Sequence, residues 1–233
     1  MDDSKFEAHI RSKYHKFVEY ERPEGEINLF ASSENRKNEV IIGGRDNVWD
    51  VYCEGYIRAA EVLVDWVTQD ELPQRTTHST FWESVAYSIV FLYRHYFELR
   101  LKEMFLTCGG DLSNIDKIHS LDKLWGLFIE RYCEFGTEYN FFVEVSLEET
   151  LQEIKPLDEI IQQLNEMDKK SQIFRYPVDR NSNNVLEEPL QFDVVHFKQL
   201  LGWASRLLDG WSDGIYECWQ QELRARYEDR LDP

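Results

Sequence analysis

Cysteine is scarce in this sequence and is never clustered. The chain has four cysteines among 233 residues, and they form neither a Cys-x-x-Cys pair nor a group with histidine: Cys53, Cys108, Cys133 and Cys218. This spacing is unlike that of structural zinc sites and of small disulfide frameworks. We therefore expect no metal, no cofactor and a reducing compartment.

Long apolar runs are also missing. No stretch approaches the roughly 20 apolar residues that a membrane-spanning helix needs. The first residues, "MDDSKFEAHIRSKYHKF", are polar and lack the apolar region of a secretory signal. We expect a cytoplasmic protein that does not contact membranes.

Positive charge is in short supply. Lysine and arginine number 26 against 44 aspartate and glutamate residues, which gives a formal net charge of −18. A field of this sign repels phosphate backbones, so general DNA binding is not expected. An RNA or nucleotide ligand would need a local basic pocket, whereas a positively charged protein partner suits the whole surface.

Apolar and aromatic residues, in contrast, are plentiful and follow helical spacing. They make up 42% and 14% of the chain, which is a globular composition. We expect an irregular N-terminal extension over residues 1–47, with a short peripheral helix before residue 20, and a helical bundle over 48–233. The fold class is all-α, a bundle of five or six helices with a long central second helix.

The expected helices follow from apolar periodicity, capping residues and breakers. They cover residues 47–69, 79–107, 119–135, 146–171 and 193–230. Glycines in "CGGD" are expected to end the second helix, and Pro156 to kink or divide the fourth. The last range fits one long helix or two consecutive ones.

The second helix contains ionisable residues among very apolar neighbours, in "FLYRHYFELRLKEMFL". Four of them fall within an arc of about 100°: Arg94, His95, Glu98 and Lys102. Two others, Arg100 and Glu103, point elsewhere and are expected to form a minor exposed edge. The four-residue stripe is either a solvated face with i,i+4 ion pairs or a buried group that forms a structural network or a functional site.

Three further features complete the candidate set. His119 opens the third helix, which a short connection should fold back against the second, and it is either a packed or capping residue or part of the site. Arg175 and Tyr176 lie in "FRYP", which is either a surface turn or part of the same site. Three tryptophans spaced by eight, Trp203, Trp211 and Trp219, fit either core packing or an interface.

The segments "YRHYFELRLKEMF", "HSLDKLW" and "FRYP" occur in the order in which bacterial HEPN-like proteins carry similar motifs. Over roughly residues 50–225 the chain resembles this defence- and toxin-associated class of helical domains. The resemblance implies antiparallel helix pairs, often in a homodimer, and in many members a metal-independent ribonuclease. The usual catalytic pair, an arginine with a histidine a few residues later, is missing after both Arg175 and Arg180.

Two functions are therefore expected. In the first, the chain is a HEPN-like ribonuclease or nucleotide-processing effector of a bacterial defence or toxin system. Its catalytic groups would be His95, Glu98, His119 and Arg175, with Arg94, Lys102 and Tyr176 on phosphate, because histidine transfers protons near neutrality and cations bind phosphate.

In the second, the chain is a non-catalytic interaction subunit. The stripe would then be a structural network, and the acidic, tryptophan-rich surface would bind a partner protein or a second copy. Convergence of the candidate residues around an open pocket would favour the enzyme. Mutual pairing in a closed interior would favour the interaction subunit.

Overall fold

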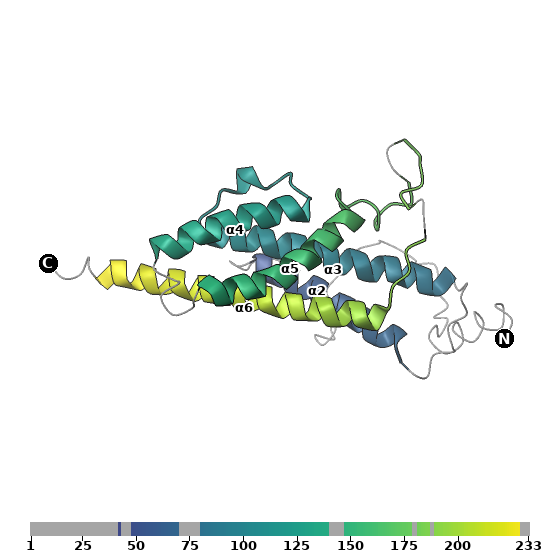
Figure 1. Ribbon diagram of the computed structural model, residues 1–233, viewed down its shortest axis with the longest axis horizontal. Helices are drawn as coiled ribbons and strands as arrows, with labels where there is room; N and C mark the ends of the chain where they lie inside the picture. Colours follow the sequence, from purple (N-terminus) through teal and green to yellow (C-terminus); the bar gives the residue numbers. More distant parts are fainter. Residues whose placement is uncertain are drawn as a thin grey trace, which may run out of the picture.

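The computed structural model describes Ile42 and residues 48–69, 80–139, 147–178, 181–186 and 189–228 (Figure 1). Five α-helices account for most of them: α2 (Val48–Val67), α3 (Thr80–Thr107), α4 (Leu121–Glu138), α5 (Leu147–Met167) and α6 (Val194–Glu228). A short 3₁₀ turn, Leu112–Asn114, lies between α3 and α4. Within these ranges there is no β-strand, and the all-α prediction is confirmed. The expected N-terminal extension lies outside the described residues except for Ile42.

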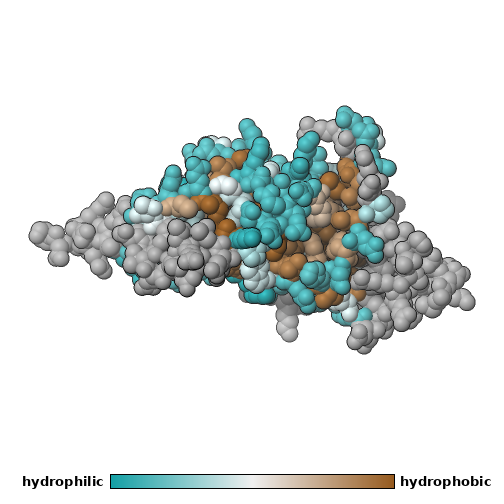
Figure 2. All heavy atoms as spheres, viewed as in Figure 1, coloured by the Kyte–Doolittle hydropathy of each residue, from teal (hydrophilic) through white to brown (hydrophobic). Residues whose placement is uncertain are grey.

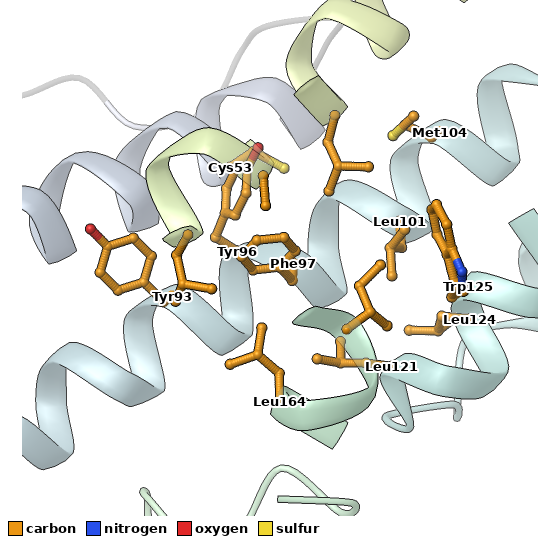
Figure 3. Close-up of a cluster of buried hydrophobic side chains, with 14 of the residues drawn as sticks. Cys53, Tyr93, Tyr96, Phe97, Leu101, Met104, Leu121, Leu124, Trp125 and Leu164 are labelled. Atoms are coloured by element: carbon orange, nitrogen blue, oxygen red, sulfur yellow. The ribbon is translucent and has the colours of Figure 1, made fainter. Parts of the chain in front are cut away.

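Helix α3 is the centre of the bundle. It packs against α2, α4 and α6, while α5 packs against α4 and α6. Its inward residues, among them Tyr93, Phe97 and Leu101, are fully buried, and Figure 3 shows them meeting side chains from the surrounding helices. The nearly all-round apolar character of this stretch is what burial on several sides requires.

Local signals set the helix boundaries close to their expected positions. Helix α4 begins one residue after Ser120, whose side chain accepts a hydrogen bond from the amide of Lys123. His119 therefore precedes the helix instead of opening it. At the end of α3, Gly109 has φ +83° and Gly110 donates to the carbonyl of Phe105 at 2.9 Å, a glycine-based helix end as expected.

Both α5 and α6 are continuous helices, although the sequence left a division of each open. Pro156 lies inside α5, which is continuous from Leu147 to Met167, so of the two expected outcomes, a kink or a division, the division does not occur. The last range forms a single helix of 35 residues, which is the first of its two expected alternatives. The sequence also predicts Ser146 as the N-terminal capping residue of the fourth range, but Ser146 lies outside the described residues.

The three tryptophans of α6 have different environments. Trp211 stacks on Tyr132 at 5.7 Å between ring centroids and on Trp125 at 6.3 Å, which fastens α6 to α4. Trp203 and Trp219 are each 38% exposed. Core packing therefore explains one tryptophan, and the other two remain at the surface.

None of the described helices combines the length and the apolar character that crossing a bilayer needs.

Two glycines give a matched test of the packing. A Cβ at Gly110 would lie 2.2 Å from the ring of Phe105, whereas a Cβ at Gly126 in α4 would meet no atom within 4 Å. Gly110→Ala should lower the free energy of unfolding by about 1–3 kcal/mol through overpacking. Gly126→Ala should raise it by up to about 1 kcal/mol through helix propensity. Urea denaturation measures both, and equal stability of the two variants would contradict this packing.

Candidate functional site

The polar stripe of α3 lies in the interior. Arg94, Glu98 and Lys102 are 0%, 2% and 6% exposed. The solvated-face interpretation is therefore wrong for these three residues. Buried charges are costly unless they are paired and hydrogen-bonded, so the arrangement of their partners determines what they do.

Arg94 uses its guanidinium to join three parts of the chain. Its Nη1 donates to Oε2 of Glu98 at 2.9 Å, one turn away on α3. Its Nη2 donates to the backbone carbonyl of His119, just before α4, and its Nε donates at 3.0 Å to the carbonyl of Asp168, just after α5. The fixed fork of an arginine suits this because its donors point in different directions.

Glu98 is the acceptor at the middle of the stripe. While Oε2 binds Arg94, Oε1 accepts from Nζ of Lys102 at 3.1 Å and lies 2.8 Å from Nδ1 of His119. Burial alone would raise the pKa of Glu98. The hydrogen bond to His119, the charge of Lys102 and the hydrogen bonds to Arg94 and Lys102 outweigh burial and hold this pKa below its ordinary value. We call Arg94, Glu98, Lys102, His119 and the carbonyl of Asp168 the Arg94 network.

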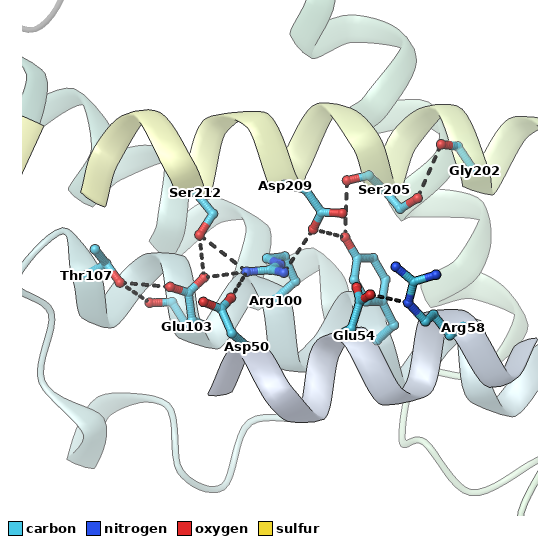
Figure 4. Close-up of polar contacts among 11 residues, drawn as sticks. Asp50, Glu54, Arg58, Arg100, Glu103, Thr107, Gly202, Ser205, Asp209 and Ser212 are labelled. Atoms are coloured by element: carbon cyan, nitrogen blue, oxygen red, sulfur yellow. Dashed lines mark hydrogen bonds and ion pairs between the residues drawn. The ribbon is translucent and has the colours of Figure 1, made fainter. Parts of the chain in front are cut away.

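A second buried network surrounds Arg100, and it corrects an expectation (Figure 4). Arg100 and Glu103, expected at an exposed edge, are each only 7% exposed. Nη1 of Arg100 lies 2.8 Å from Oδ1 of Asp50 on α2, and Nη2 lies 2.9 Å from Oδ1 of Asp209 on α6. Ser212 of α6 donates to Glu103 at 2.9 Å.

Tyr96 extends the second network. Its hydroxyl donates to Oδ1 of Asp209 at 2.7 Å and lies 3.1 Å from the carbonyl of Ser205. Burial raises the pKa of the neighbouring Cys53 thiol to about 12, so this cysteine stays protonated near neutrality. We call Arg100, Glu103, Asp50, Asp209, Ser212 and Tyr96 the Arg100 network. In the sequence, the Arg100 network was indicated only by the nearly all-round apolar character of α3, which leaves little room for a solvated side.

His95 shares the stripe but packs among aromatic rings. Its ring stacks on Phe91 at 5.5 Å and meets the edge of Tyr56 at 4.5 Å, and its buried Nδ1 has no hydrogen-bond partner among the described residues. Burial lowers the pKa of His95, with the charges of Arg175 and Arg94 acting in the same direction against that of Glu98. A neutral imidazole held in this way is suited to packing.

Arg175 and Tyr176 lie in the turn after α5. The Arg175 guanidinium sits 5.8 Å from the Phe91 ring and 6.0 Å from the Tyr176 ring, and its Nε donates to the carbonyl of Ser171. Both residues line a cavity of about 480 Å³, together with Tyr87 and other residues.

The structure therefore divides the seven candidate residues. Four belong to the Arg94 network: Arg94, Glu98, Lys102 and His119. Two line the cavity, and none of the Arg94 network is among the residues that line it. His95 lies between the two groups, because the Phe91 ring contacts both His95 and Arg175.

No protein-family model, curated protein or solved structure matches this chain. In the part of the chain that the structure describes, no three His, Cys, Asp or Glu side chains are grouped so that they could hold a metal ion.

The shape of the Arg94 side chain should matter as much as its charge. Arg94→Lys should lower the free energy of unfolding by about 3 kcal/mol, because one ammonium cannot reach Glu98 and two separate carbonyls. Arg206→Lys, at an exposed position of α6, should change it by less than about 0.5 kcal/mol. Equal effects of the two substitutions on the urea midpoint would contradict the network.

The stabilisation from Glu98 should depend on pH in one direction. Its pKa is lowered in the folded state from an ordinary value of 4.5, so ionised Glu98 stabilises the fold fully above this pH. Stabilisation is lost as the pH falls through the lowered pKa. The stability difference between the wild type and Glu98→Gln should thus be constant near neutrality and shrink in acid. Denaturation at a series of pH values measures it, and a difference that grows in acid would refute the assignment.

Proposed function

We propose that this chain is a HEPN-like helical interaction subunit without catalytic activity, in which the polar stripe holds the bundle together. One observation carries the proposal: the donors of the fully buried Arg94 end on Glu98 and on two backbone carbonyls. A phosphate clamp would need those donors to face a ligand. Instead they bond to groups of the protein itself.

The surface supports a protein partner of positive charge. The net charge is −18, and α6 exposes aromatic side chains at its C-terminal half, where Tyr216 is 51% and Trp219 38% exposed. Aromatic residues are enriched in protein interfaces. Figure 2 shows apolar and hydrophilic residues side by side on the face that carries α4, α5 and α6. We therefore infer a basic partner subunit, in keeping with a role in a bacterial defence assembly.

A second candidate function, metal-independent RNA cleavage, is favoured by one observation. The side chain of His119 is 49% exposed although its Nδ1 is held by the buried Glu98. A carboxylate in this position fixes the ring and leaves the other nitrogen available for proton transfer. In this mechanism His119 would be the general base, and Arg175 would have to approach from the neighbouring cavity.

RNA cleavage without added metal distinguishes the two candidates. We expect wild-type protein, incubated with tRNA or total RNA and a chelator, to release no more fragments than a protein-free control. His119→Ala and His95→Ala variants should then give the same result as the wild type. The proposal is overturned if wild-type protein cleaves RNA and His119→Ala abolishes cleavage while His196→Ala, an exposed histidine at the start of α6, does not.

A further inference from the structure

Helix α2 has apolar residues on the side that faces away from the bundle as well as on its core side. Cys53, Ile57 and Val64 are buried against the other helices. The outward face consists of small and apolar residues, all exposed: Val48, Val51, Tyr52, Gly55, Ala59 and Val62. Val62 is 64% exposed, the highest value on this face for a large apolar residue. A surface helix ordinarily places charged and polar residues there.

Gly55 lies in the middle of this outward face, and no contact within the bundle requires a glycine there. A glycine in a helix interior is less stable than alanine by roughly 0.5–1 kcal/mol. A Cβ at Gly55 would meet no atom within 4 Å, so packing does not require its absence. With Ala59 one turn later, the position suits close approach of another helix, since the side chains at a contact set the distance between helix axes.

The charges beside the outward face indicate what would cover it. Four carboxylates run along one edge of α2, which we call the acidic edge: Asp50, Glu54, Glu61 and Asp65. Arg58 is the single basic residue of α2, so the helix carries a net charge of −3 (four acidic residues, one basic). Asp50 and Asp65 pair with Arg100 and Lys198, and Glu54 pairs with Arg58 one turn later in α2.

Negative charge nevertheless persists along this side of the bundle. The pKa of Asp209 on α6 is raised by burial and further by the charges of Glu54 and Asp213, although Tyr96 and Arg100 act against the shift. The acidic edge should therefore favour an occupant with basic residues.

The chain itself contains a segment with the complementary pattern. Residues 5–18, "KFEAHIRSKYHKFV", lie outside the described residues and have four Lys or Arg against one Glu. At helical spacing, one face would carry Phe6, Ile10, Tyr14 and Phe17. Along one side of that face would lie Lys5, His9, Lys13 and Lys16.

Handedness fixes the relative direction of the two helices. When α2 and a helical segment 5–18 are each viewed from the N-terminus, the charged residues of both lie on the counterclockwise side of the apolar face. Two such helices bring opposite charges together only when they run antiparallel. That direction places the end of the segment beside Val48, which residues 19–47 can reach easily, because each extended residue spans about 3.3 Å.

A second copy of α2 fits the same surface less well. In the antiparallel arrangement it would place one acidic edge against another, and like charges facing each other across an interface are unfavourable. We propose that residues 5–18 of the same chain form a helix that packs antiparallel on the outward face of α2, with its lysines along the acidic edge. This inference is independent of the proposed function.

Hydrogen exchange of residues 5–18 in the full-length protein tests the proposal. Amides of this segment should exchange at least about tenfold more slowly than in the isolated peptide. Glu54→Lys/Glu61→Lys should abolish the protection, and adding Lys13→Glu/Lys16→Glu to this variant should restore it by exchanging the charges. Glu130→Lys/Glu166→Lys, which makes the same charge change at exposed positions on α4 and α5, should leave protection unchanged.

Val62→Asp provides an independent check, since its side chain is mostly exposed and its replacement should not disturb the bundle. It should also abolish protection while circular dichroism stays unchanged. The proposal is overturned if the segment exchanges as fast as the free peptide. It is also overturned if Glu130→Lys/Glu166→Lys removes the protection just as Glu54→Lys/Glu61→Lys does. Protection that appears only as a dimer forms, measured by light scattering across concentrations, overturns packing within one chain.

Discussion

The guanidinium of Arg94 is fully buried, and the structure around it depends on meeting its hydrogen-bonding needs. Removing such a cation from water costs several kcal/mol, which only a complete set of acceptors can offset. Those acceptors come from α3 itself, from His119 two residues before α4 and from Asp168 directly after α5. The three segments must therefore hold a fixed geometry for the charge to be tolerated.

Arg100 has the corresponding role on the other side of α3. It pairs with Asp50 of α2 and Asp209 of α6. Two arginines six residues apart therefore connect α3 with α2 and α6 and with the segments next to α4 and α5; these are the other four α-helices of the described residues. Apolar burial supplies most of the stability of such a bundle but is not directional. The two networks specify how the helices are rotated about their axes, because a rotated helix would leave a buried charge without its partner.

The sequence predicted the helices well because periodicity and capping are local signals. It also predicted that Arg94, Glu98 and Lys102 share one face of α3, and that His119 would return to them through a short connection. The carbonyls of His119 and Asp168 could not be foreseen, since a backbone acceptor has no side-chain signature. Arg100 was wrongly expected at an exposed edge because its partners lie 50 and 109 residues away in the chain. Only packing brings these partners together.

The claim that the polar stripe is structural is tested most directly by a double-mutant cycle between Arg94 and Glu98. The free energy of unfolding would be measured for the wild type, Arg94→Met, Glu98→Leu and the double variant. Arg94→Met leaves Glu98 with Lys102 and His119 alone, and Glu98→Leu leaves Arg94 with two carbonyls and without the carboxylate that accepts its hydrogen bond. We therefore expect large losses for both single variants. The loss for the double variant should be smaller than the sum of the two single losses by roughly 2 kcal/mol. Single variants as stable as the wild type, with no coupling between them, would contradict a structural role and direct attention back to catalysis.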